Sequence, residues 1–366
     1  MKNNDNIIFF IPSIEGGGVE KNLLLIINHF SKNYNKLFLI TCSHLNKDLP
    51  KNVEILTPKN KWFNRSRIIK NVLCSKILTT ILYKKKNISV FSFQANIFAI
   101  IITKLRSKKI AIRLNSSPKI WSKNIFKIHL FKFFYSLADK IIVNSYEFKR
   151  DVKNIFNLKS NVIYNPLNKN EILKKSKKRV NNNFFLKKDN SLKILNIGRF
   201  TKQKNQILIL KAINEIKDKF NLKLFILGRG IEEYNLRKYI KINNLKKYVK
   251  IIKYTNNPYP YMRNSDLFIL SSIYEGLPNV LIESQLLNKP IISATCPSGP
   301  REILMNGKAG ILFKNNDLES LVTKIRFYFK NKHKINQMVK TGKKNIERFN
   351  YDVNMRKYLK ILRSIN

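Results

Sequence analysis

Short apolar runs alternate with helical patterns along the whole chain, and this alternation restricts the fold more than any other feature. Apolar runs that are each followed by a turn and a helical pattern are typical of βαβ units, whose strands form a parallel sheet. The predicted strands are 6–11, 36–41, 53–56, 89–93, 109–114, 140–144, 161–163, 192–197, 222–227, 267–270 and 291–294. We therefore expect an α/β protein.

The pattern is interrupted once and then begins again. Residues 168–190 are polar, rich in Lys and Asn, and weakly periodic, so we interpret them as a linker. The linker separates an N-terminal Rossmann-like domain at 1–167 from a C-terminal one at 191–350, and we expect the two domains to face each other across a cleft. Ligands of open parallel sheets bind beyond the carboxyl ends of the strands. The cleft is therefore the predicted active site.

Cysteine content and hydropathy bear on the compartment. Cys42, Cys74 and Cys296 show no CxxC spacing, so we expect no disulfide framework and no zinc ribbon, and a reducing compartment fits best. The first residues do not resemble a signal peptide. The longest uncharged stretch, 87–103, contains polar side chains and is too short for a spanning helix, so it predicts a strand, a turn and a buried helix. We expect a cytoplasmic protein.

The chain is strongly basic, with 71 Lys and Arg against 22 Asp and Glu, a formal charge of +49. Compositional drift in a Lys-rich and Asn-rich chain is one explanation, and an anionic partner is the other. We find no nucleic-acid-binding motif. Two stretches, 61–86 around Trp62 and 119–134 around Trp121, interleave basic with aromatic residues, as interfacial membrane helices do. The alternative is an ordinary helix whose aromatic side chains face a sheet.

Two carboxylates stand at the start of a predicted helix. Glu275 and Glu283 have seven residues between them, and the helix opens at Pro278 or Asn279, after a buried strand. The spacing alone is a weak signal, but its position strengthens it. Backbone N–H groups at a helix start bind phosphate, and carboxylates accept hydrogen bonds from sugar hydroxyls. We prefer this interpretation to solvated helix charges.

The chain resembles the retaining glycosyltransferases of family 4, which have the two-domain GT-B fold. The resemblance covers most of the chain. Its motifs together are highly specific for the family, but the paired-glutamate segment is the only one that would be specific by itself. In chain order the similar segments are Gly16-Gly17-Gly18-Val19-Glu20, Ala138 to Ser145, Val162 to Pro166, Gly198-Arg199 with Lys204, Glu275-Gly276-Leu277-Pro278-Asn279-Val280-Leu281-Ile282-Glu283, and Pro297 to Ile303. The resemblance implies that a C-terminal helix, 351–366, packs back on the N-terminal domain.

The resemblance also implies an activity. A nucleotide-sugar, UDP-sugar favoured over GDP-sugar, would donate a hexosyl or N-acetylhexosaminyl group to a lipid-linked or cell-surface saccharide, in polysaccharide, O-antigen or lipopolysaccharide assembly. Candidate catalytic residues are Glu275, Arg199 and Lys204. Candidate donor-binding residues are Gly16, Gly17, Gly18, Gly198, Gly276, Leu277, Pro278, Asn279, Val280 and Glu283. A plain glycine turn and two ordinary surface cations are the alternatives to this donor site.

The chain departs from the family in two respects. Many relatives carry a histidine on the acceptor side, whereas the loop after the 109–114 strand has none and offers Arg113 and Asn115 instead. No Asp-x-Asp occurs, so we expect neither a metal nor a cofactor. The expected partners are the donor, the lipid-linked acceptor and the anionic inner face of the plasma membrane, without nucleic acid. A sugar-nucleotide epimerase of the same fold and a basic nucleic-acid-binding protein are the alternative functions.

Overall fold

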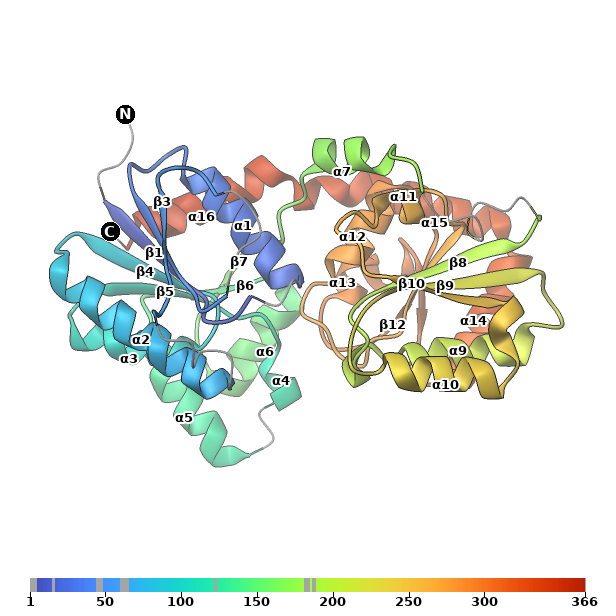
Figure 1. Cartoon of the computed structure of the whole chain (residues 1–366), viewed down its shortest axis with the longest axis horizontal. Helices are drawn as coiled ribbons and strands as arrows, with labels where there is room; N and C mark the ends of the chain where they lie inside the picture. Colours follow the sequence, from blue (N-terminus) through green and yellow to red (C-terminus); the bar gives the residue numbers. More distant parts are fainter. Residues whose placement is uncertain are drawn as a thin grey trace. The chain divides into compact units, whose positions relative to one another are not determined.

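A computed structural model describes residues 5–14, 17–43, 49–59, 66–121, 124–180, 185 and 189–365, except for the side chain of Trp121. Contacts divide the chain into two compact units (Figure 1): Met1–Pro166 with Tyr351–Asn366, and Leu167–Asn350. Each unit is a parallel sheet covered by helices. The α/β class predicted from the alternation of apolar runs and helical patterns is confirmed.

The sheet of the first unit has seven parallel strands in the order β3-β2-β1-β4-β5-β6-β7. The strands are β1 (Asn6–Phe10), β2 (Leu37–Ile40), β3 (Val53–Leu56), β4 (Ile88–Ser92), β5 (Lys109–Arg113), β6 (Lys140–Val143) and β7 (Asn161–Val162). The helices are α1 (Gly18–Phe30), α2 (Arg67–Lys84), α3 (Asn96–Leu105), α4 (Pro118–Trp121), α5 (Ile125–Ser136), α6 (Tyr146–Phe156) and α16 (Tyr351–Arg363).

Helices cover both faces of this sheet. Successive side chains of a strand point to opposite faces, so Ile7 and Phe9 enter one core while Ile8 and Phe10 enter the other. The first core is closed by α1 and α16, and the second by α2, α3, α5 and α6. Both cores exclude water from the strands, as a parallel sheet requires.

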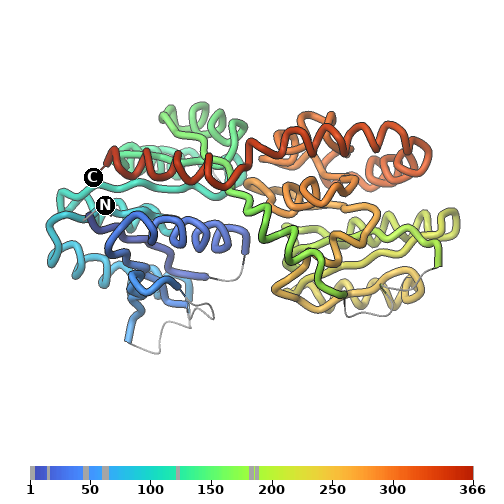
Figure 2. The backbone as a smooth tube through the Cα atoms, turned by 90° about the horizontal axis from the view of Figure 1, so that it is seen from above, coloured from blue at the N-terminus to red at the C-terminus, as the bar shows by residue number. Residues whose placement is uncertain are grey.

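Helix α16 belongs to the first unit although it follows the second in the chain. Figure 2 shows this last, red helix running back along the first unit. Its side chains Met355, Tyr358 and Leu362 are fully buried in the α1 core. The ring of Tyr358 lies 5.9 Å from that of Phe91 on β4, between ring centroids.

The sheet of the second unit has six parallel strands in the order β10-β9-β8-β11-β12-β13. They are β8 (Leu192–Ile197), β9 (Leu222–Gly228), β10 (Val249–Lys253), β11 (Leu267–Leu270), β12 (Ile291–Ala294) and β13 (Ile311–Phe313). The helices are α7 (Lys169–Ser176), η2 (Lys202–Lys204), α9 (Gln206–Ile216), α10 (Glu233–Ile242), η3 (Leu245–Lys247), α11 (Tyr259–Arg263), α12 (Asn279–Leu286), α13 (Pro300–Ile303), η4 (Met305–Gly307), α14 (Leu318–Lys330), α15 (Lys332–Lys344) and η5 (Asn345–Phe349).

All the predicted strands are present, with ends that differ by no more than about one residue, which is within the usual scatter of assignments. Two strands were not predicted, β10 and β13, and both lie at the edges of the second sheet. Edge strands are often short or charged. Strand β13 has three residues, and β10 carries lysines at exposed positions, so neither produces the apolar run that marks a central strand.

The prediction of a linker at 168–190 is wrong for its first part, which forms α7. Asn168 caps this helix by accepting a hydrogen bond from the N–H of Glu171 at 3.2 Å, and Ile172 is buried. The helix packs against α11, and the amide of Asn257 donates to the carbonyl of Lys175 at 3.0 Å. The capping signal was present in the sequence, but the surrounding lysines obscured it.

The uncharged stretch 87–103 forms β4, a turn and most of α3, as predicted. None of the helices within the described ranges has both the length and the apolar content needed to cross a bilayer. All three cysteines are buried and unbridged, and the sulfur atoms of Cys42 and Cys74 lie 3.3 Å apart.

Gly228, at the end of β9, has no room for a side chain, because a Cβ would lie 1.9 Å from the carbonyl oxygen of Gly198. We expect Gly228→Ala to lower the free energy of unfolding by about 1–3 kcal/mol, the usual cost of overpacking. The matched control is Gly198→Ala, whose Cβ would meet its nearest atom at 3.5 Å; its stability should stay within about 1 kcal/mol of wild type. Equal denaturation midpoints would contradict this prediction.

Candidate active site

The predicted catalytic residues follow two neighbouring strands of the second sheet. Arg199 and Lys204 come after β8, and Glu275 comes after β11. These strands are paired in parallel, so their carboxyl ends meet at one edge of the sheet. This is the edge where open parallel sheets bind ligands.

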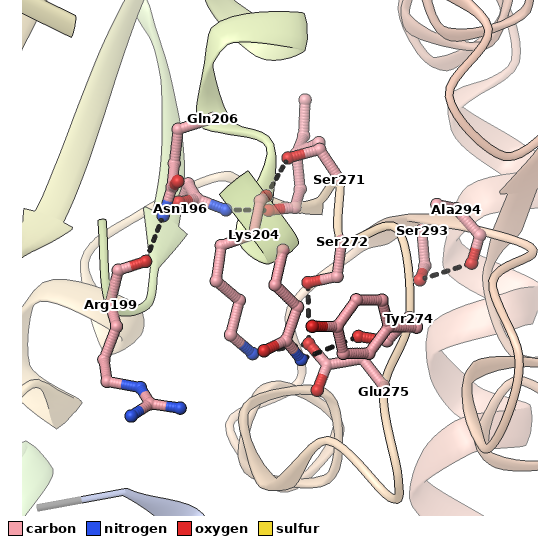
Figure 3. Close-up of polar contacts among 12 residues, drawn as sticks. Asn196, Arg199, Lys204, Gln206, Ser271, Ser272, Tyr274, Glu275, Ser293 and Ala294 are labelled. Atoms are coloured by element: carbon pink, nitrogen blue, oxygen red, sulfur yellow. Dashed lines mark hydrogen bonds and ion pairs between the residues drawn. The ribbon is translucent and has the colours of Figure 1, made fainter. Parts of the chain in front are cut away.

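Glu275 is the centre of this edge. The residue is 7% exposed, and its Oε1 accepts hydrogen bonds from the ammonium group of Lys204 at 2.5 Å and the hydroxyl of Ser272 at 2.6 Å (Figure 3). Burying a carboxylate without hydrogen-bond partners would cost roughly several kcal/mol of folding free energy. The two bonds therefore explain how a charged group is held at this depth.

The backbone of Glu275 is held by the loop after β12. Its N–H donates to the carbonyl of Pro297 at 2.8 Å, and its own carbonyl accepts from the N–H of Ser298 at 3.1 Å. The next residue, Gly299, has φ +93°, and a Cβ there would lie 2.1 Å from the carbonyl oxygen of Gly276. Only glycine fits this close approach. The position of Glu275 therefore depends on its own loop after β11, on the loop after β12 and, through Lys204, on the loop after β8.

The β8 loop is held against the β11 loop by polar bonds. The hydroxyl of Ser271 donates to the carbonyl of Lys204 at 2.9 Å, and the side chain of Gln203 donates to the carbonyl of Tyr274 at 2.9 Å. Gln206 donates to the carbonyl of Arg199 at 3.0 Å. The side chain of Arg199 is exposed, and Figure 3 draws its guanidinium apart from the Lys204–Glu275 pair.

Glu283 lies inside α12 and is 4% exposed. Its Oε1 accepts a hydrogen bond from the hydroxyl of Tyr259, on α11, at 3.3 Å. The helix begins at Asn279, one of the two starts predicted from the sequence, and Pro278 is its N-cap residue. Proline has no side-chain acceptor, so it cannot cap the first N–H groups of α12. Such a helix start is suited to an anion.

Positive charge and hydrogen-bond acceptors occur together at this edge. It combines the cations Arg199 and Lys204, the start of α12 and two buried carboxylates able to accept from hydroxyls. In the described part of the chain, no group of three or more His, Cys, Asp or Glu side chains is arranged to hold a metal ion.

The glycine loop of the first unit is described in part. Gly16 lies outside the described residues, and Gly18 is the first residue of α1. The N–H of Gly17 donates to the carboxylate of Glu20 at 2.8 Å, and Glu20 is 8% exposed. A donor phosphate could bind the N–H of Gly17 only by displacing the carboxylate of Glu20. The prediction from the sequence did not include this competition.

The two acceptor-side candidates lie together at the end of β5: Arg113 is its last residue, and Asn115 follows in the loop. Arg113 is 1% exposed, and its guanidinium donates to Asn115 at 2.7 Å and to Asn165 at 2.6 Å. The amide of Asn115 donates to the carbonyl of Phe93 at 2.5 Å, and Asn115 is partly exposed. The guanidinium of Arg113 is therefore buried and bonded to two asparagines, whereas Asn115 keeps a partly exposed side chain.

Other segments that carried the family resemblance have structural roles. In the segment Ala138 to Ser145, Asp139 accepts from Lys104 at 2.6 Å and from the N–H of Ile110 at 2.8 Å, while Ser145 caps α6.

Ser272 was not predicted as a site residue, although two serines directly after a buried strand were a usable signal.

Solved structures identify the class of fold. A glycosyltransferase from Rickettsia africae superposes with a TM-score of 0.80 at 18% identity, covering 99% of each chain. The Anabaena protein HepE, solved in complex with UDP and glucose, superposes with a TM-score of 0.79 at 17% identity, covering 99% of this chain and 100% of that one. At these identities the likeness shows the fold alone, and the fold is that of the GT-B glycosyltransferases.

Sequence comparisons identify the family. The family described as glycosyl transferases group 1 matches residues 177–345. The N-acetylgalactosamine-N,N'-diacetylbacillosaminyl-diphospho-undecaprenol 4-alpha-N-acetylgalactosaminyltransferase of Campylobacter jejuni is 30% identical over 266 residues, 67% of this chain and 70% of that protein. An uncharacterized glycosyltransferase of Methanocaldococcus jannaschii is 33% identical over 189 residues, 50% of this chain and 46% of that protein. The chain belongs to the group 1 glycosyltransferase family.

The chain spans about half the length of several curated relatives that it matches. The aligned part covers 46% of the Methanocaldococcus protein and 52% of the AmsD glycosyltransferase of amylovoran biosynthesis from Erwinia amylovora, which is 30% identical over 189 residues, 51% of this chain. In both cases the aligned part is also only about half of this chain.

The Lys204–Glu275 pair should be strongly coupled, because its side chains are 18% and 8% exposed. In a double-mutant cycle of Lys204→Met and Glu275→Gln, we expect a coupling free energy of unfolding above about 1 kcal/mol. The matched control is the pair Arg237–Glu233 on α10, whose side chains are 54% and 36% exposed. That pair should couple by about 0.3–0.5 kcal/mol. A coupling for Lys204–Glu275 no larger than the control would mean that burial does not strengthen this ion pair.

Proposed function

We propose that this protein is a retaining, metal-independent glycosyltransferase of the family 4 type. It transfers a hexosyl or N-acetylhexosaminyl group from a nucleotide-sugar, UDP-sugar in preference to GDP-sugar, to a saccharide hydroxyl. The observation that carries the proposal is the carboxylate of Glu275, buried at the carboxyl edge of the second sheet and paired with Lys204. The HepE complex with UDP and glucose, a structure of the same fold, supports the choice of donor.

The departing diphosphate sets the electrostatic demand. As the glycosidic bond breaks, the sugar approaches an oxocarbenium ion, and negative charge grows on the phosphate. Arg199, Lys204 and the N–H groups at the start of α12 stabilise this charge, which is the preorganised electrostatic kind of catalysis. Lys204 reaches the phosphate by exchanging or sharing its bond to Glu275. The leaving phosphate accepts the proton of the acceptor hydroxyl.

The two carboxylates orient the donor. Glu275 accepts a hydrogen bond from a hydroxyl of the donor sugar, and Glu283 accepts from the ribose diol. The bonds from Ser272 to Glu275 and from Tyr259 to Glu283 fix these carboxylates before the donor binds. Fixing the geometry in advance lowers the entropic cost of reaching the reactive arrangement.

The acceptor is a lipid-linked saccharide in the assembly of a polysaccharide, O-antigen or lipopolysaccharide. The Campylobacter relative is named for transfer to a saccharide on diphospho-undecaprenol, which supports this choice. The protein then works in the cytoplasm as a peripheral protein on the inner face of the plasma membrane, with Asn115 on the acceptor side. Nucleic acid is not a partner.

Incubation with radiolabelled UDP-sugars and GDP-sugars, with and without lipid-linked acceptor, tests the proposal. We expect label to enter the acceptor with retained anomeric configuration, and no altered sugar nucleotide to be released. Release of an altered sugar nucleotide without acceptor would identify an epimerase. Binding to nucleic acid without any turnover would identify a nucleic-acid-binding protein.

Arg199→Ala and Glu283→Gln should each weaken donor binding about 10-fold to 100-fold, because a hydrogen bond involving a charged group contributes about 1.5–3 kcal/mol. Glutamine keeps an acceptor for Tyr259, so the fold is retained. Calorimetric titration with UDP and GDP measures the effect, and Arg237→Ala on α10 is the control that should keep wild-type affinity. Unchanged affinity in both site variants would refute the assignment of the donor site.

Transfer should continue in excess EDTA, because the cations that stabilise the leaving group belong to the protein. The initial rate with and without chelator measures this. Complete loss of transfer on chelation, with recovery on addition of Mn²⁺ or Mg²⁺, would show that the reaction needs a metal ion.

A further inference from the structure

Helix α5 is apolar on two opposite sides. Ile128, Phe131 and Tyr135 pack against the core beneath the first sheet. Phe126, Leu130, Phe133 and Leu137 follow the spacing i, i+4, i+7, i+11, which places them in one stripe along the other side of the helix. They are 81%, 51%, 61% and 40% exposed. We call this stripe the α5 ridge; globular packing requires an inner apolar side only, so the ridge needs another explanation.

The neighbouring helices continue the exposed apolar surface. Helix α3 packs between α2 and α5 on the same side of the sheet (Figure 1). On these neighbours Leu105 is 78% exposed and Ile68 is 71% exposed. On the opposite side, Val353, at 38%, is the one exposed large apolar side chain of α1 and α16, both of which are described in full. Chance composition would not concentrate apolar exposure on one side.

The part of the chain that contains α2, α3 and α5 has basic side chains and no acidic ones. No Asp or Glu occurs between Glu54 and Asp139, whereas that interval contains 18 Lys and Arg. Lys127 and Lys132 on α5 flank the ridge, and both are exposed. An apolar stripe bordered by cations matches a surface that offers hydrocarbon together with negative charge. An anionic bilayer offers both.

We propose that the α5 ridge, with its lysine border and the adjoining outer sides of α2 and α3, docks on an anionic lipid bilayer. The proposal rests on the proposed function, because a lipid-linked acceptor requires the enzyme to work at a membrane. A second copy of the chain fits poorly, because an isologous contact would bring two exclusively basic surfaces together. Docking inserts the ridge side chains into the interface, while Lys127 and Lys132 contact lipid phosphates.

Co-sedimentation of the full chain with vesicles tests this docking. Wild type should bind vesicles of phosphatidylcholine and phosphatidylglycerol at low salt, more weakly as salt rises, and should ignore pure phosphatidylcholine. Phe126→Gln with Phe133→Gln should weaken binding at least about tenfold. Lys127→Gln with Lys132→Gln should weaken it by about fivefold for each charge.

The matched controls lie on α10 of the other unit. Tyr234 and Ile242 are 73% and 66% exposed, and Lys238 and Lys241 are exposed as well. Their changes to glutamine should leave vesicle binding as in wild type. Wild type that ignores anionic vesicles at low salt would overturn the docking proposal, as would ridge variants that bind like wild type.

Two further measurements separate the alternatives. Donor affinity by calorimetry should be unchanged in the ridge variants, so loss of docking with intact donor binding leaves the proposed function standing. Sedimentation velocity without vesicles should show the same association state for wild type and for Phe126→Gln with Phe133→Gln. A wild-type dimer that dissociates in this variant would instead assign the ridge to a second copy and overturn membrane docking.

Discussion

The buried carboxylate of Glu275 is the constraint on which the site depends. A charge at 7% exposure is tolerated only when opposite charge and hydrogen bonds compensate it. Lys204 and Ser272 provide both, and they come from the loops after two paired strands. The environment of this carboxylate therefore depends on the pairing of β8 with β11 and on the close backbone approach that glycine permits at position 299. A change that separates these loops leaves that charge without partners.

Most of the fold could be predicted from local pattern, because central parallel strands are continuous apolar runs and their helices follow at regular intervals. The failures occur where local pattern is weak. Strands β10 and β13 lie at sheet edges, where neither a long apolar run nor full burial is required. Helix α7 is polar on most sides, and its stability depends on contact with α11, which is distant in sequence.

For the candidate site, the sequence indicated which residue types follow the strands but not which contacts they make. Arg199, Lys204 and Glu275 could be placed at the carboxyl edge of a sheet because each lies in a segment that follows a predicted strand. The burial of Arg113 and its bonds to Asn115 and Asn165 depend on tertiary packing, which spacing does not report. The bond from Gly17 to Glu20 is instead a local contact at the start of α1, and its spacing of three residues could have been recognised in the sequence. Ser272 acts only through its bond to Glu275, so its role becomes visible once the two loops are seen together.

The position of α16 in the chain has a consequence for biosynthesis. The ribosome releases the chain from its N-terminus, and domains generally fold as they emerge. The first unit needs Met355, Tyr358 and Leu362 to close the core beneath α1, yet these residues emerge after the whole of Leu167–Asn350. The second unit is continuous and can complete its core first. During synthesis one face of the N-terminal sheet therefore stays covered by α1 alone until α16 emerges, and in this interval its remaining apolar surface is accessible to a nascent-chain chaperone.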